Sequence, residues 1–109
     1  MTSAELNGEK VFILMHMGGG NGETYGPWGR EFAKLVDRFE GTIVAQFYGH
    51  THNDEFKVFY DRETNARPIN IAYVSPSVTT WKNMNPSYRI FTIDGDYEGS
   101  SHVSHSSVH

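Results

Sequence analysis

The sequence predicts a mixed α/β fold in which one main amphipathic helix packs against a mixed β-sheet. Two short apolar runs, 11–15 and 42–48, are rich in β-branched and aromatic residues, which is typical of buried strands. Between these runs, apolar residues recur at the spacing i, i+3, i+4 and i+7, which indicates a helix. Three further segments have the composition of strands: 56–60, 69–74 and 89–93.

The first predicted strand is apolar at every position of Val11–Met15 and runs directly into His16. Continuous apolar runs of this length are typical of strands that are buried on both faces of a sheet. The glycines of 18–20 follow and predict a loop with a flexible backbone. The sequence therefore predicts a fully buried strand that ends at a histidine.

The predicted helix carries one apolar stripe, and Gly41 stands just beyond it, where helices often end in a left-handed turn. Because this is the one strong amphipathic helix in the sequence, it can cover only one face of the sheet. We expect the other face to be uncovered and the chain to self-associate through it. The stripe consists of Phe32, Leu35, Val36 and Phe39.

The second predicted strand ends at the segment Gly49-His50-Thr51-His52. Ligands of α/β sheets bind in the crevice at the carboxyl ends of the strands, so His16, His50 and His52 are placed where chemistry is usual. Residues two apart in an extended chain point the same way, so we expect His50 and His52 to face one centre. Three imidazoles suit zinc. The alternative is a surface turn whose histidines bond to water or backbone.

The composition excludes several classes of protein. A chain of 109 residues, 38% hydrophobic and 14% aromatic, has the means to build a packed core. A net charge of -4 argues against nucleic-acid partners and against polybasic membrane targeting. The absence of cysteine excludes disulfides and thiolate metal ligands. We expect no transmembrane segment and no signal peptide in these residues, because the longest apolar run is far short of the roughly 20 residues that span a bilayer.

Several short motifs follow one another in an order that is specific to one family. Ala45–Tyr48 leads into Gly49–His52, and Asp54–Phe56 follows. The likeness runs from about Gly8 to Val103 and resembles the acid sphingomyelinase branch of the calcineurin-like metallophosphoesterases. The further matching stretches are Val58–Asp61, Arg67–Pro68, Ser75–Ser77, Thr79–Thr80, Asn85–Pro86, Tyr88–Arg89, Ile93–Gly95 and Gly99–His102.

The resemblance implies a fold, a cofactor and an activity. The family fold is an αββα sandwich with a centre of two zinc ions, and the complete enzymes hydrolyse sphingomyelin to ceramide and phosphocholine in lysosomes or outside the cell. His50 and His52 resemble the family's Gly-His-x-His ligands, one for each zinc. His16 resembles the ligand that ends the preceding strand. Metal ligation by these three histidines is what the resemblance implies here.

The sequence also departs from the family pattern. Met17-Gly18-Gly19 stands where the family has a hydrophobic residue and two prolines. The Asp-x-His motif, the bridging aspartate and the Gly-Asn-His motif do not occur, so the resemblance covers only the C-terminal half of the catalytic domain. We therefore assign residues 1–98 to a partial metallophosphoesterase domain and 99–109 to a Ser/His-rich tail that we expect to be disordered.

Two functional hypotheses remain open. In the first, the chain is part of a sphingomyelin phosphodiesterase and supplies histidine metal ligands, with one zinc or none of its own and no catalytic residue. In the second, it is a truncated isoform or relic that binds zinc or a partner without turnover. Asp54 and Glu55 either orient an imidazole or belong to a solvated turn, which is the commoner role. Tyr73, Trp81 and Tyr88 border a choline group or belong to the core.

Overall fold

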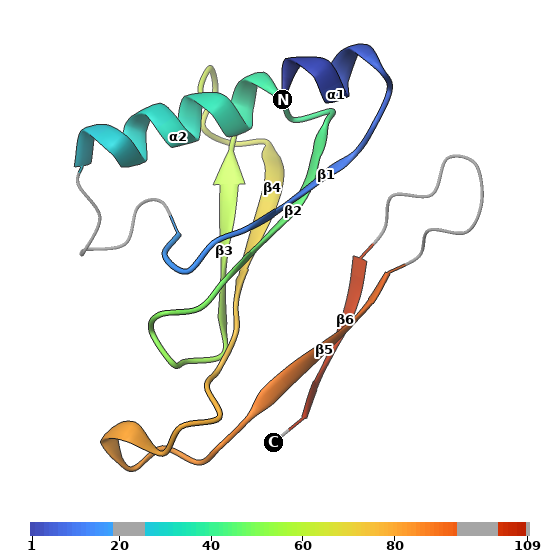
Figure 1. Ribbon diagram of the computed structural model, residues 1–109. Helices are drawn as coiled ribbons and strands as arrows, with labels where there is room; N and C mark the ends of the chain where they lie inside the picture. Colours follow the sequence, from blue (N-terminus) through green and yellow to red (C-terminus); the bar gives the residue numbers. More distant parts are fainter. Residues whose placement is uncertain (19–25, 94–102, 109) are drawn as a thin grey trace.

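The computed structural model describes residues 1–18, 26–93 and 103–108, and it confirms a mixed α/β fold with a four-stranded mixed sheet (Figure 1). A two-stranded sheet accompanies the larger one. The elements in chain order are α1 (Thr2–Leu6), β1 (Val11–Leu14), α2 (Gly26–Arg38), β2 (Ile43–Tyr48), β3 (Glu55–Tyr60), β4 (Pro68–Val74), the short 3₁₀ helix η1 (Trp81–Asn83), β5 (Tyr88–Ile93) and β6 (Val103–Val108).

The larger sheet has the strand order β1-β2-β4-β3. β1 and β4 both run parallel to β2, and β3 returns antiparallel to β4. β2 is therefore central, and four of its six residues are buried, as expected for a strand rich in β-branched and aromatic residues. This order places the carboxyl ends of three parallel strands at one edge of the sheet.

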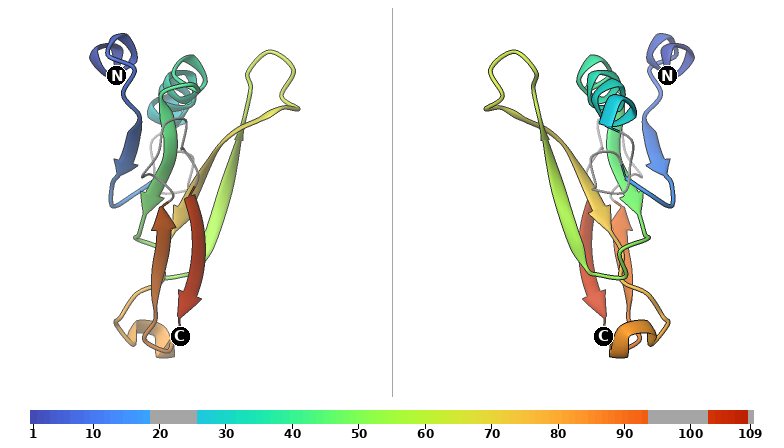
Figure 2. Two further views of the ribbon diagram at one scale, coloured as in Figure 1. Left: turned by 90° about the vertical axis from the view of Figure 1, so that its right-hand side faces the viewer. Right: turned by 90° about the vertical axis from the view of Figure 1, so that its left-hand side faces the viewer.

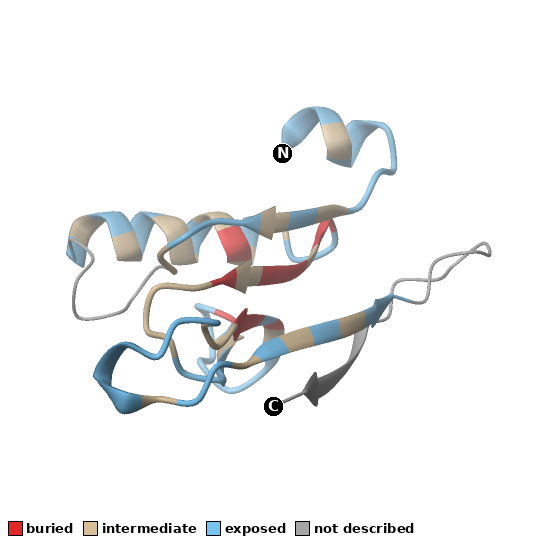
Figure 3. Cartoon of the chain, turned by 60° about the horizontal axis from the view of Figure 1, so that its bottom comes forward, coloured by how far each residue is buried: buried red, intermediate tan, exposed pale blue. Residues whose placement is uncertain are grey.

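Helix α2 covers one face of this sheet through its apolar stripe. Val36 is fully buried, and the Phe32 ring lies edge-on to the Phe59 ring of β3 at 6.2 Å between centroids. The buried residues concentrate in β2, in β4 and in the part of α2 that lies against them (Figure 3). The core on this face joins Tyr48, Ala72 and Val74 with the partly buried Ile13, Phe32 and Phe59.

A chain of polar side chains crosses the core beneath α2. The Tyr48 hydroxyl donates to Gln46 Oε1, and Gln46 Nε2 donates to Asn70 Oδ1 at 3.0 Å. Asn70 Nδ2 in turn donates to the carbonyl of Ile43 at 2.7 Å. Gln46 is fully buried, so its amide needs these partners to avoid an uncompensated desolvation cost.

The second face of the sheet is covered at its centre, which corrects the expectation that it is bare. Phe47 points away from α2 because it follows Gln46 and precedes Tyr48 in an extended strand. The Phe91 ring of β5 lies 4.7 Å from the ring of Phe47 and 5.1 Å from that of Tyr73. Phe91 belongs to β5, which forms a separate two-stranded ribbon with β6 (Figure 2). The large apolar residues still exposed on the strands of the four-stranded sheet include Phe12, Leu14, Phe56, Tyr60 and Ile71.

The prediction that the first strand is buried on both faces was wrong. β1 alternates between half-buried and exposed residues, and Leu14 is 73% exposed. The physical reason is its place at the edge of the sheet, where β2 is its only partner among the strands that the structure describes. A strand at an edge lacks a neighbour on its outer side, so an apolar side chain there has less protein to pack against.

Disorder of the tail at 99–109 stays a prediction, and the structure describes part of this segment. Residues 103–108 form β6, which pairs antiparallel with β5 from Tyr88↔Val108 to Ile93↔Val103. Backbone pairing needs no apolar period, which is why the Ser/His composition did not reveal it. Residues 99–102 and 109 lie outside the described part of the chain. No helix within the described residues is long and apolar enough to cross a membrane.

Candidate metal-binding site

The carboxyl ends of the parallel strands β1, β2 and β4 lie together at one end of the sheet. Backbone hydrogen bonds continue the pairing beyond the strands: Gly49 N donates to His16 O at 3.0 Å, and Ser75 N donates to Tyr48 O at 2.8 Å. A Cβ added at Gly49 would be in ordinary contact with His16, 3.9 Å from the imidazole Nδ1. The sequence prediction that His16 and His50 follow neighbouring strand ends is confirmed.

The imidazoles of His16 and His50 are in direct contact. His16 Nε2 lies 3.2 Å from His50 Nδ1, and the two rings are nearly perpendicular with their centroids 5.1 Å apart. His16 is exposed and His50 is half-buried. Two nitrogen atoms from segments 34 residues apart in sequence therefore converge on one small volume at the edge of the sheet.

The structure does not bring His52 into this pair. His50 and His52 both have left-handed backbone conformations, with φ of 78° and 64°. The segment is therefore not extended at these two residues, and the expectation that both side chains face one centre stays a prediction. No three His, Asp or Glu side chains of the described residues lie close enough together to hold a metal ion. Of the three histidines predicted as ligands, the structure brings together two.

The geometry of the His16–His50 pair fits two ligands of one tetrahedral zinc ion. Zinc binds imidazole nitrogen at about 2.0 to 2.1 Å, which places two nitrogens of a tetrahedral site about 3.3 to 3.4 Å apart. The observed separation of 3.2 Å is close to this value. Two imidazoles fill half of a tetrahedral site, so further ligands have to come from outside the pair.

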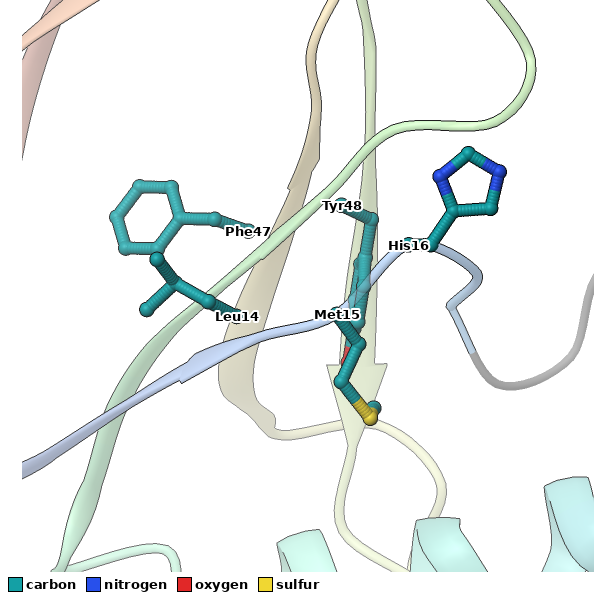
Figure 4. Close-up of a pocket in the computed structure, with 5 residues that line it drawn as sticks. All are labelled: Leu14, Met15, His16, Phe47 and Tyr48. Atoms are coloured by element: carbon teal, nitrogen blue, oxygen red, sulfur yellow. The ribbon is translucent and has the colours of Figure 1, made fainter.

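An open hollow of about 390 Å³ lies beside this pair, lined by Leu14, Met15, His16, Phe47 and Tyr48. Leu14 and Phe47 lie together on one side of β1, and His16 extends beyond the end of that strand (Figure 4). The hollow is therefore apolar along the strands and carries an imidazole at one end. Sequence analysis missed Leu14 and Phe47 as lining residues, because continuous apolar runs suggested core positions.

Tyr48 lines the hollow and lies against the loop after His16, and sequence analysis missed it as well. A Cβ added at Gly18 would lie 3.0 Å from the Tyr48 ring, so a side chain there would require the ring to shift by a few tenths of an ångström. Burial raises the pKa of the Tyr48 phenol well above its ordinary value, so the hydroxyl stays protonated and donates to Gln46.

The known proteins to which this chain is similar are sphingomyelin phosphodiesterases and related phosphodiesterases. No protein-family model matches the chain. The sphingomyelin phosphodiesterase of Homo sapiens is 48% identical over 103 residues, which cover 94% of this chain and 16% of that protein. That of Bos taurus is 47% identical with the same coverage, and the acid sphingomyelinase-like phosphodiesterase 3b of Mus musculus is 33% identical over 110 residues. The chain spans 16% of the length of the first two relatives.

Proposed function

We propose, on the premise that this chain is homologous to one segment of the sphingomyelin phosphodiesterases, that it supplies two histidine ligands of their zinc centre. His16 and His50 bind one zinc ion in this proposal, and the remaining ligands come from parts of the relatives that the chain does not match. The activity served is the hydrolysis of sphingomyelin, in which water cleaves the phosphodiester to give ceramide and phosphocholine.

The observation that carries the proposal is the 3.2 Å approach of His16 Nε2 to His50 Nδ1. Imidazoles bind zinc in their neutral form, and a tautomer that leaves each of these nitrogens unprotonated presents two lone pairs at one place. A zinc ion held there supplies a Lewis acid for the phosphoryl oxygen and acidifies a bound water. The residues of this chain hold the ion and leave its other positions open.

His52 has a separate role in this proposal. The family resemblance gives His50 and His52 to different zinc ions, and a ligand of a second ion has no reason to join the His16–His50 pair. The turn at His50 and His52, with φ of 78° and 64°, is compatible with side chains that serve different centres. The resemblance also supports a lysosomal or extracellular location, which labelling of the expressed protein in cells would test.

The test is zinc stoichiometry of the purified chain, in a background where His102, His105 and His109 are replaced by serine so that tail histidines do not contribute. We expect about one weakly bound zinc per chain, because the pair provides only two ligands, and His16→Ala should abolish this binding. His50→Gly should abolish it too, and glycine tolerates the left-handed backbone at that position. His52→Ala is the matched control and should leave the first zinc in place.

Hydrolysis of a choline phosphodiester by the same samples separates the two hypotheses. Zinc without turnover supports a binding segment whose catalysis needs further residues, and turnover that is lost in His16→Ala supports a catalytic half-site. A chain that binds no zinc, or that loses its zinc only in His52→Ala, would overturn the proposed role of the pair.

A further inference from the structure

The loop that carries His50 and His52 has an unusual backbone. Both residues adopt positive φ, a region that residues other than glycine occupy rarely and only where the surrounding structure fixes them. The start of the loop is fixed by the hydrogen bond from Gly49 N to His16 O and by the bond from Ser75 N to Tyr48 O. The question is what fixes its end.

Thr51 makes local polar contacts within the loop. Its Oγ1 donates to Glu55 Oε1 at 2.8 Å and accepts from Asn53 N at 3.3 Å. These bonds shape the turn and reach as far as Glu55, the first residue of β3. The His50 imidazole also contacts His16, and a side chain from the second sheet contacts the end of the loop.

Arg89 of β5 makes such a contact. Its Nη2 lies 2.9 Å from Oδ1 of Asp54, and the Arg89 and Asp54 side chains are only 6% and 20% exposed. The guanidinium lies 5.5 Å from the ring centroid of Tyr73 and 5.4 Å from that of Phe91. Both rings restrict the guanidinium, so Asp54 is held by a group with little freedom to move.

The degree of burial separates this pair from the surface ion pairs of the chain. Arg67–Glu40 joins atoms 3.0 Å apart with side chains 62% and 40% exposed, and Arg38–Glu5 is similarly solvated. Exposed pairs hold their partners weakly because water and salt compete for the charges. A charge left alone in a buried pair is costly, so the Arg89–Asp54 bond resists opening.

We infer that the Arg89–Asp54 ion pair is a positioning device that fixes the end of the His50–Asn53 loop and thereby aims the His50 imidazole at His16. Asp54 stands four residues after His50, and its bond to a second sheet closes the loop at the end opposite to Gly49. The inference rests on the proposed function only for its effect on zinc, because the effect on the loop exists without metal.

The test compares Arg89→Met with Arg67→Met, which removes an exposed guanidinium of the same size. Amide hydrogen exchange of the metal-free chain is measured at residues 50–53 and in β2. We expect Arg89→Met to speed exchange in the loop by about tenfold or more while β2 is unchanged, and Arg67→Met to leave the loop unaffected. Arg89→Lys should fall between, because an ammonium neither stacks nor forms a fork.

Zinc affinity provides the second measurement. Loss of a group that orients a ligand typically weakens metal binding by about 10 to 100 times, and we expect this for Arg89→Met. If Arg89→Met disturbs β2 as well, Asp54→Asn decides, since it keeps Arg89 on the two rings and removes only the opposite charge. Loop exchange that is unchanged in both variants would overturn the inference. A wild-type chain that binds no zinc but whose loop depends on Arg89 would refute the proposed function alone.

Discussion

Replacing Asn70 with alanine should destabilise the chain far more than the loss of one surface amide would. Asn70 is 7% exposed and takes part in two hydrogen bonds, one accepted from Gln46 Nε2 and one donated to Ile43 O. Alanine removes both bonds and provides no replacement. Because Gln46 is fully buried, its amide nitrogen is left without a partner where water cannot easily reach it.

The magnitude follows from these two losses. A buried donor left unsatisfied costs about 1 to 3 kcal/mol, and an ordinary hydrogen bond contributes about 0.5 to 1.5 kcal/mol. We therefore expect Asn70→Ala to lower the free energy of unfolding by about 2 to 4 kcal/mol. With an m-value of about 1 to 3 kcal/mol/M in urea, the midpoint should fall by roughly 0.7 to 4 M.

Urea denaturation followed by fluorescence and circular dichroism measures this loss. Asn53→Ala, in the exposed turn after His52, is the control and should change stability by no more than about 0.5 kcal/mol. The double variant Gln46→Met with Asn70→Ala should cost less than the sum of its single variants, because the stranded amide is gone. A loss below about 0.5 kcal/mol for Asn70→Ala would refute the argument that the polar chain is sealed from water.

Two further predictions concern acid and association. Hydrogen bonds to Asp61 from the Thr64 and Arg67 backbone amides and the Thr64 hydroxyl hold the pKa of this buried carboxyl well below its usual range. The unfolded pKa is then the higher one, so the contribution of Asp61 is complete above about pH 4 and is lost as pH falls toward the folded value. Urea midpoints between pH 6 and 2 should show this decline in the wild type and a flatter curve in Asp61→Asn. Leu14 is 73% exposed on the edge strand, so Leu14→Glu should reduce self-association in sedimentation velocity without loss of stability; an unchanged sedimentation coefficient in an associating wild type would exclude this surface.

Much of the fold was predictable because the local signals agree with one another. The spacing of Phe32, Leu35, Val36 and Phe39 is that of one face of a helix. The first three lie in α2, and Phe39 follows its last residue. The strand at 42–48 is rich in β-branched and aromatic residues, and it is the central strand with neighbours on both sides. The same pattern at 11–15 was misleading, since an apolar run shows that a segment prefers burial and not whether a neighbour is there to bury it.

At the histidine site, too, some features follow from local sequence and others depend on the tertiary structure. Strand ends are readable from sequence, so the proximity of His16 and His50 was accessible before any coordinates. The orientation of His52 was not, because it depends on two left-handed residues in a short turn, and histidine gives only a weak signal for that conformation. Arg89 lay beyond prediction for another reason: its contact with Asp54 exists only once the two sheets have packed together.

The contact between His16 and His50 ties together positions 34 residues apart, and one of them stands at the end of the edge strand. A cross-link over such a distance restricts the unfolded chain much as a staple does, and its entropic effect grows slowly with the length of the loop that it closes. Any ion shared by these two rings would therefore fasten the outermost strand to its neighbour. Metal occupancy and attachment of β1 would then be coupled. The concentration of free zinc would therefore set the population of molecules in which β1 is detached from β2.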